Sequence, residues 1–305
     1  MCPVGLDLAR DFWAEEVAPR LGPLGRVVAA GLVGEGSECF GFDDTLSRDH
    51  DWGPAVCLWL RRADRDAAVP IRAALAHLPS SFHGHRVRRP SLEAVHRTGL
   101  LEVEGFYRRF TGLERPPATP EEWLACPGYA LAACTNGAVF ADGPGAFSAH
   151  REALLAHYPE PVRRLRLAAH LEAAAQGGQY NLPRALQRSD RVAATLALAA
   201  FLRHAMAAAF LLARRYPPFS KWTHRALTEL PAPWPELARC LTDLARATTA
   251  RETDRRVEAA AALLAGGLVR DGLPAGQGLF LLDHAHRIRE SIDDPHILAL
   301  HPRID

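Results

Sequence analysis

The sequence has little net charge and no paired cysteines. Its formal net charge is only +1, whereas a strong nucleic-acid binder usually carries a basic domain. The six cysteines are scattered and no Cys-x-x-Cys occurs, so we expect neither a zinc site nor a disulfide framework, and a reducing cytoplasm fits better. The first residues, Met1-Cys2-Pro3, do not lead into a charged region followed by an apolar one, so we expect no signal peptide.

Lysine and uninterrupted apolar runs are also scarce. Lys221 is the only lysine among the 36 basic residues. In a chain so biased toward arginine, a single lysine indicates that a compact point charge is needed; the alternative is a cation that satisfies the last carbonyls of a helix. Residues 192–213 are apolar, but Arg203 and His204 interrupt the run, which favours a buried helix over a membrane span.

Small and acidic residues stand between two apolar runs, 27–33 and 54–60. Gly36-Ser37 follows the first run, and eleven residues separate Ser37 from Asp49-His50-Asp51. On a strand, Asp49 and Asp51 would point to one face, and Mg²⁺ needs few carboxylates because waters and phosphates complete its shell. A Gly-Ser turn lets backbone N–H groups approach phosphate oxygens. The pattern predicts a site for a nucleoside triphosphate and its metal; the alternative is a solvated loop, which the same residue types favour.

This combination resembles the signature of the nucleotidyltransferase superfamily, apolar-Gly-[Gly/Ser] followed at a similar distance by Asp-x-[Asp/Glu]. The longer string Gly-x-Gly-Ser-x-x-x-Gly-x-Asp, continued by Ser-x-Asp-His-Asp-Trp-Gly-Pro, is similar to a bacterial branch of that superfamily classed as a domain of unknown function. Arg215 to Trp222, Arg-Tyr-Pro-Pro-Phe-Ser-Lys-Trp, resembles a second motif of that branch. The superfamily includes DNA polymerase beta-like and antibiotic nucleotidyltransferases, and members of this branch join the catalytic core to a helical C-terminal domain.

The resemblance implies a role for particular residues. Asp49 and Asp51 would be the catalytic metal ligands for Mg²⁺, with two ions expected. The β- and γ-phosphates of the triphosphate would be held by Gly36 and Ser37 on one side and by Ser220 and Lys221 on the other.

A third carboxylate is expected on a neighbouring strand, and here the match is imperfect. The family position falls near Gly99, which is not acidic. We assign the role to Glu102, with Glu93 as the other option.

Two further groups of residues leave alternatives open. The pair His83 and His85 would be a metal site or, more simply, a solvated edge. Arg163 and Arg166, after Tyr158-Pro159, resemble another family stretch and would face a binding cleft or form structural ion pairs.

The resemblance also implies the reaction. We expect a cytoplasmic enzyme that moves a nucleoside monophosphate from a nucleoside triphosphate, ATP by preference, to a hydroxyl of a small-molecule acceptor, with release of pyrophosphate. No membrane partner is expected, and a nucleic-acid acceptor is not favoured. The alternatives are nucleotidylation of a protein or tRNA and a catalytically inactive nucleotide-binding module, which an absent third carboxylate would favour.

The expected fold is α+β, with a nucleotidyltransferase domain of mixed sheet and flanking helices over 1–118 and a helical bundle over 119–305. Thr119-Pro120-Glu121-Glu122 predicts a capping box at the start of a helix. Hydrophobic periodicity and turn residues predict the other elements. The expected strands are 27–33, 54–60, 100–103 and one within 135–143; the expected helices are 6–20, 67–78, 104–110, 121–134, 148–156, 160–176, 181–216, 233–247, 253–267 and 276–291.

Overall fold

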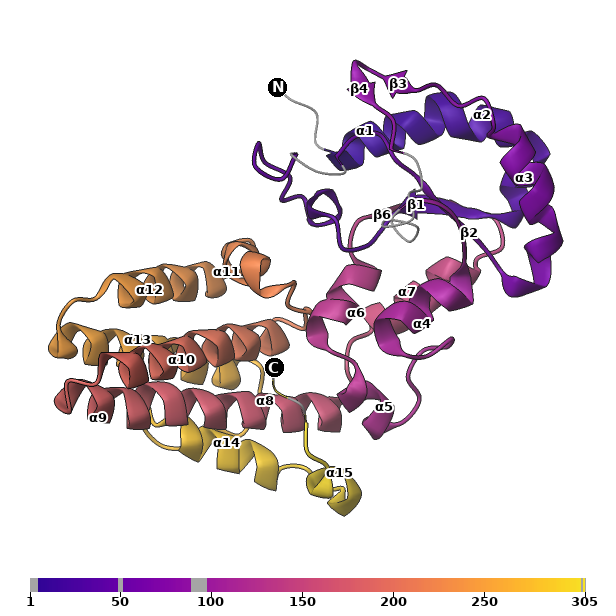
Figure 1. Ribbon diagram of the computed structural model, residues 1–305. Coiled ribbons are helices and arrows are strands. Elements are labelled where there is room, and N and C mark those ends of the chain that lie inside the picture. The colour runs from indigo at the N-terminus through magenta and orange to yellow at the C-terminus, as the bar shows by residue number, and fades with distance from the viewer. Residues whose placement is uncertain (1–4, 49–51, 89–97, 303, 305) are drawn as a thin grey trace. The chain divides into compact units, whose positions relative to one another are not determined.

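The computed structural model describes residues 5–48, 52–88, 98–302 and 304. The chain forms two compact units (Figure 1), which we call the sheet unit (Met1–Ala118 with Ala130–Ala156) and the helical unit (Thr119–Tyr129 with His157–Asp305). The predicted boundary after residue 118 is one of the places where the chain passes from one unit to the other. Residues 130–156 then return to the sheet unit, because they contain one of its strands.

The sheet unit is built on a mixed four-stranded sheet with the order β5-β2-β1-β6. β1 pairs antiparallel with both β2 and β6, and β2 pairs parallel with β5. A separate hairpin of β3 and β4 carries His83 at its exposed turn and His85 beside it. The strands are β1 (Ala29–Leu32), β2 (Cys57–Leu60), β3 (Ser81–Phe82), β4 (His85–Arg86), β5 (Gly99–Glu102) and β6 (Ala138–Asp142).

Short helices accompany this sheet. The first predicted helix, 6–20, is interrupted by a π-helical turn, and the helix predicted over 121–134 is split where Cys126-Pro127 leaves the helical conformation. The helical elements are α1 (Gly5–Phe12), η1 (Trp13–Val17), α2 (Ala18–Leu21), η2 (Gly22–Val27), η3 (Ser37–Phe40), η4 (Arg62–Ala67), α3 (Ala68–Ala74), α4 (Val103–Thr111), α6 (Gly128–Thr135) and α7 (Ala146–Leu155).

Both central strands are buried at every position, which explains why they read as continuous apolar runs. On one face, Leu58 and Leu60 join Leu8 and Phe12 of α1 in the main hydrophobic cluster. On the other face, Trp59 stacks on Phe147 with ring centroids 4.0 Å apart. Since β-strand side chains alternate between faces, this arrangement fixes the register of β2.

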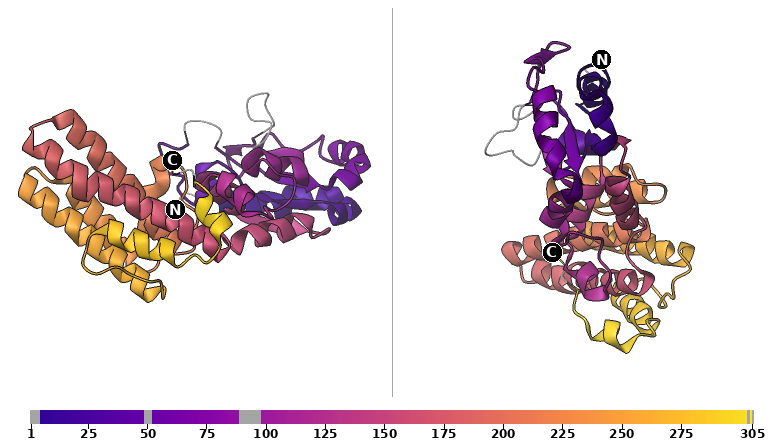
Figure 2. Two further views of the ribbon diagram at one scale, coloured as in Figure 1. Left: turned by 90° about the horizontal axis from the view of Figure 1, so that it is seen from below. Right: turned by 90° about the vertical axis from the view of Figure 1, so that its right-hand side faces the viewer.

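The helical unit contains the remaining elements. α10 packs against α8, and α8 also packs against α14 (Figures 1 and 2). The Thr119 capping box is confirmed, because the Thr119 hydroxyl accepts the Glu122 N–H and the Glu122 carboxylate accepts the Thr119 N–H. The helices are α5 (Pro120–Ala125), α8 (Glu160–Ala174), η5 (Ala175–Asn181), α9 (Leu182–Gln187), α10 (Arg191–Leu212), α11 (Ser220–Thr228), α12 (Trp234–Arg246), α13 (Ala250–Arg270), α14 (Leu281–Glu290) and α15 (Pro295–Ala299).

The single helix predicted over 181–216 is two helices. Ser189 has a φ of +57°, which no α-helical residue adopts, and the Asp190 carboxylate then accepts the Ala193 N–H to start α10. α10 is long and apolar enough to cross a membrane, since the mean hydropathy of its most apolar 18 residues is 1.7. Half of that segment, however, is buried within the protein. The burial agrees with the predicted core helix.

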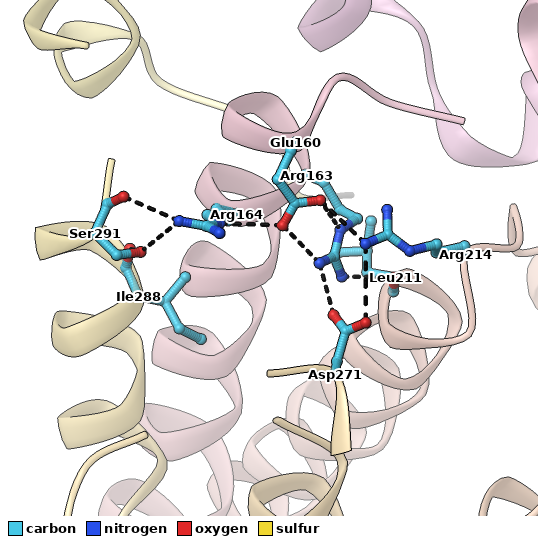
Figure 3. A network of polar contacts seen from close by, with 8 residues as sticks. All are labelled: Glu160, Arg163, Arg164, Leu211, Arg214, Asp271, Ile288 and Ser291. Carbon is cyan, nitrogen blue, oxygen red and sulfur yellow. Dashed lines mark hydrogen bonds and ion pairs between the residues drawn. The ribbon is translucent and has the colours of Figure 1, made fainter. Parts of the chain in front are cut away.

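A network of ion pairs joins three helices of the helical unit (Figure 3). The Arg163 side chain is fully buried; its Nη2 donates to Glu160 at 2.8 Å and to Asp271 at 2.6 Å. Its Nη1 donates to the Leu211 carbonyl at 3.3 Å. Arg163 therefore forms structural ion pairs, the second of the two alternatives left by the sequence.

Candidate functional site

The Gly-Ser loop, which we define as residues 33–42, is held by the start of β6. The Asn136 side-chain amide accepts the Gly34 N–H at 3.0 Å and donates to the Gly34 carbonyl at 2.7 Å. Next to it, Gly137 has a φ of +59° and its N–H donates to the Cys39 carbonyl at 2.8 Å. A Cβ at Gly137 would overlap the Leu32 carbonyl oxygen, so only glycine fits there.

Hydrogen-bond donors remain in the centre of this loop. Gly36 is extended and precedes the short helix η3. Within the part of the chain that the structure describes, the N–H groups of Gly36 and Ser37 and the Ser37 hydroxyl donate no hydrogen bond. Groups of successive backbone donors of this kind bind anions. Binding of phosphate by Gly36 and Ser37 stays a prediction.

Two arginines from elsewhere in the sheet unit reach the same loop. Arg88 Nη1 lies 2.6 Å from Glu38 Oε1, and each of these side chains is less than a tenth exposed. Arg109 Nη2 lies 2.7 Å from Glu35 Oε2 in a more exposed pair. The Glu38 carboxylate lies directly against Gly36, where a Cβ would overlap it. These residues line a hollow of about 10 Å³, close to the size of one water.

Sequence reasoning missed these two ion pairs. The signal that could have indicated them is the presence of Glu35 and Glu38 inside a motif otherwise made of small residues. Their partners lie 74 and 50 residues away.

The predicted metal ligands Asp49 and Asp51 lie outside the described residues. The described residues beside them are fixed: the Asp43 carboxylate accepts the Gly5 N–H at 2.8 Å and the Trp52 indole N–H at 3.0 Å. Among the described residues there is no group of three or more His, Cys, Asp or Glu side chains that could hold a metal. The assignment of Mg²⁺ to Asp49 and Asp51 therefore stays a prediction.

The predicted third carboxylate, Glu102, lies at the last position of β5. In the parallel pairing of β2 and β5, Cys57 is opposite Gly99 and Leu60 is opposite Glu102. At about 3.3 Å per residue, Glu102 lies about 10 Å along the strands from the Gly99 position that the family pattern indicates. Its carboxylate pairs with Arg62 at 3.4 Å. Its catalytic role stays a prediction, and the other option, Glu93, lies outside the described residues.

Ser220 and Lys221 begin α11 in the helical unit, and both are exposed. The Lys221 Nζ lies 5.4 Å from the Trp222 ring centroid. Because Lys221 occupies the first turn of its helix, the alternative of a cation that satisfies the last carbonyls of that helix is wrong. Binding of the triphosphate by this pair stays a prediction.

Three comparisons with known proteins complete this description. A family model described as a domain of unknown function, DUF4037, matches residues 123–223. No curated protein matches the chain. Among solved structures, the chain is similar to a nucleotidyltransferase-like protein from Exiguobacterium sibiricum 255-15, with 13% identity over 88% of this chain and 77% of that chain and a TM-score of 0.36.

Proposed function

We propose that this protein is a metal-dependent nucleotidyltransferase whose Gly-Ser loop holds the triphosphate of its donor. The observation that carries the proposal is the set of groups at this loop. The N–H groups of Gly36 and Ser37 and the Ser37 hydroxyl have no partner in the described part of the chain, and the guanidinium groups of Arg88 and Arg109 lie beside the same loop. Such a set of donors and cations suits a polyphosphate.

The arginines would exchange their partners when the triphosphate binds. In this structure each guanidinium is neutralised by one carboxylate, that of Glu38 or Glu35. The hollow is too small for a phosphate beside those carboxylates. A bound phosphate would therefore take the carboxylates' place on Arg88 and Arg109, because charged oxygens of either kind satisfy the same guanidinium donors.

Transfer then consists of attack by an acceptor hydroxyl on the α-phosphorus. A new oxygen–phosphorus bond forms, the bond to the leaving pyrophosphate breaks, and the hydroxyl proton passes to a base. Positioning and charge neutralisation supply most of the catalysis in such a reaction. Mg²⁺ bound by Asp49 and Asp51 would neutralise charge on the reacting phosphates, and Ser220 with Lys221 would add contacts to the triphosphate. The proposed donor is ATP and the proposed acceptor a small hydroxylated molecule.

A second candidate is a nucleotide-binding module without catalysis. The position of Glu102 favours it, because this carboxylate belongs to an exposed ion-pair group with Arg62 and Glu114 and the aligned strand position is Gly99. Such a module would bind the nucleotide through the same loop and release no pyrophosphate. Measuring nucleotide binding beside turnover separates the two candidates.

The test is Mg²⁺-dependent pyrophosphate release with each of the four nucleoside triphosphates. Candidate acceptors are then screened by mass shift. We expect release with ATP and a loss of about a thousandfold or more in the D49N and D51N variants, since each would remove a ligand of the metal. The matched control is D44N, because Asp44 is an exposed aspartate outside the Gly-Ser loop that accepts the N–H groups of Leu46 and Ser47 and the Ser47 hydroxyl.

Two results would contradict the proposal, and a third would change the proposed acceptor. Release that survives unchanged in D49N and D51N would remove the assignment of the metal ligands. Nucleotide binding without pyrophosphate release in the presence of any acceptor would favour the inactive module. A steep loss of acceptor binding with salt would move the acceptor to a nucleic acid.

A further inference from the structure

The helical unit contains a cavity whose lining includes Ser220 and no residue of the Gly-Ser loop. Its volume is about 540 Å³, within the range of pockets that bind small molecules. The lining comes from the end of α5, the residues that follow it, α8, α10 and the start of α11. All of the lining residues fall within the segment 123–223 that the family model matches.

Aromatic rings form part of the wall. Tyr129 and Phe219 lie with ring centroids 5.1 Å apart and planes inclined by 32°. Tyr129 is 42% exposed although it is large and apolar over most of its surface. Tyr158 is buried and packs edge-on against Trp123 and Tyr216. Rings arranged in this way offer stacking surfaces to a flat ligand.

The charged part of the wall is wholly positive. Arg166 is buried, and its Nη2 donates to the carbonyls of Trp123, Leu124 and Cys126. Arg203 is exposed and forms no ion pair within the described part of the chain. Among the described residues, no Asp or Glu lines the cavity. A ligand with a negative charge would therefore meet two guanidinium groups in this lining.

His170 adds a neutral polar group to the lining. His170 Nδ1 lies 3.0 Å from His204 Nδ1, so one ring donates a hydrogen bond to the other. Burial, with the charges of His204 and Arg166, lowers the pKa of His170 to about 3, and the ring is neutral near pH 7. The Nε2 of His170 forms no hydrogen bond among the residues the structure describes. A neutral ring of this kind adds one polar contact and no further charge.

We infer that this cavity binds a small molecule in which a flat aromatic ring carries an anionic group, either a carboxylate or a phosphate. The ring would stack on Tyr129 and Phe219, and the anion would pair with Arg166 and Arg203. This inference does not rest on nucleotidyl transfer.

The experiment measures binding by calorimetry to the full-length protein without nucleotide or Mg²⁺. The probes are 2-naphthoate and 2-naphthyl phosphate as aromatic anions, 2-naphthamide as the neutral ring, and inorganic phosphate as the anion without a ring. We expect one aromatic anion to bind at least about tenfold more tightly than 2-naphthamide or phosphate, which corresponds to one charge-assisted contact. The better of the two anions identifies the anionic group.

Two variants assign the contacts. R203Q should weaken binding of the aromatic anion by about tenfold and leave binding of 2-naphthamide unchanged. Y129S should weaken binding of every naphthyl probe. R191Q is the matched control, because Arg191 is exposed on the same helix about 18 Å from Arg203. This variant should bind the probes like the unaltered protein. The inference is overturned if no aromatic anion exceeds 2-naphthamide or if R203Q and R191Q bind alike. Either failure leaves the proposed function untouched, because no nucleotide is present.

Discussion

Arg109 in the sheet unit and Arg163 in the helical unit both pair with glutamate, but they differ in what surrounds the pair. Arg163 is fully buried and its donors are engaged by Glu160, Asp271 and the Leu211 carbonyl. Arg109 is a third exposed, holds one carboxylate, and lies beside a loop with unused backbone donors. The first arginine is committed to the fold, whereas the second is able to exchange its carboxylate for a phosphate. The comparison teaches that an ion pair indicates function only when its neighbourhood contains further donors for the same ligand.

The largest effect should follow removal of the committed arginine. R163A leaves Glu160 and Asp271 near each other without the buried cation, so we expect it to lower the free energy of unfolding by about 3–5 kcal/mol. Urea unfolding followed by helical circular dichroism measures the change. R214Q is the control, since the Arg214 side chain is half exposed in the same network and should cost at most about 1 kcal/mol. Equal losses in the two variants would mean that Arg163 is no more committed to the fold than a half-exposed arginine of the same network.

A smaller, pH-dependent effect should follow neutralisation of Glu160. Burial raises the pKa of Glu160, but the hydrogen bonds and charge of Arg163, with Arg164 and Arg214, outweigh it and lower the pKa to about 2. The folded protein therefore binds fewer protons than the unfolded chain between about pH 4.5 and 2. The stabilisation is complete above this window and is lost as pH falls through it.

The variant E160Q isolates that contribution. Because the Glu160 side chain is about a third exposed, we expect E160Q to be less stable than the unaltered protein by only about 1–2 kcal/mol at pH 7. The difference should shrink as pH falls below about 4.5 and approach zero only below about pH 2. Urea unfolding of both proteins at several pH values measures it. A difference that stays constant with pH would mean that Glu160 acts through packing and not through its charge.

The sequence predicts the local features well because their causes are local. The Thr119 capping box depends on residues three apart, and the two central strands lie within the apolar runs that predict them. The break between α9 and α10 was missed, since Ser189 in a positive-φ conformation has no strong sequence signal. Cys126-Pro127 did carry a signal, because proline disfavours the helical conformation in the residue before it.

The candidate site is predicted only in part for a related reason. Gly36 and Ser37 are recognisable because the motif is contiguous. The arginines that meet the loop, and Asn136, which holds the loop from just before β6, come from distant positions in the chain. Pairings over such separations depend on the tertiary fold, which hydrophobic periodicity does not specify.

The most direct test of the central claim is the affinity of the Gly-Ser loop for inorganic tripolyphosphate, measured by calorimetry with Mg²⁺ present. The account predicts that E38Q binds more tightly than the unaltered protein, by about tenfold, because a competing carboxylate charge is removed. It predicts that R109Q binds about tenfold more weakly, whereas R108Q is unchanged, because Arg108 pairs with Glu114 and not with a glutamate of the loop. Tripolyphosphate that binds all four proteins equally, or none of them, would contradict the claim that this loop and its arginines hold a polyphosphate.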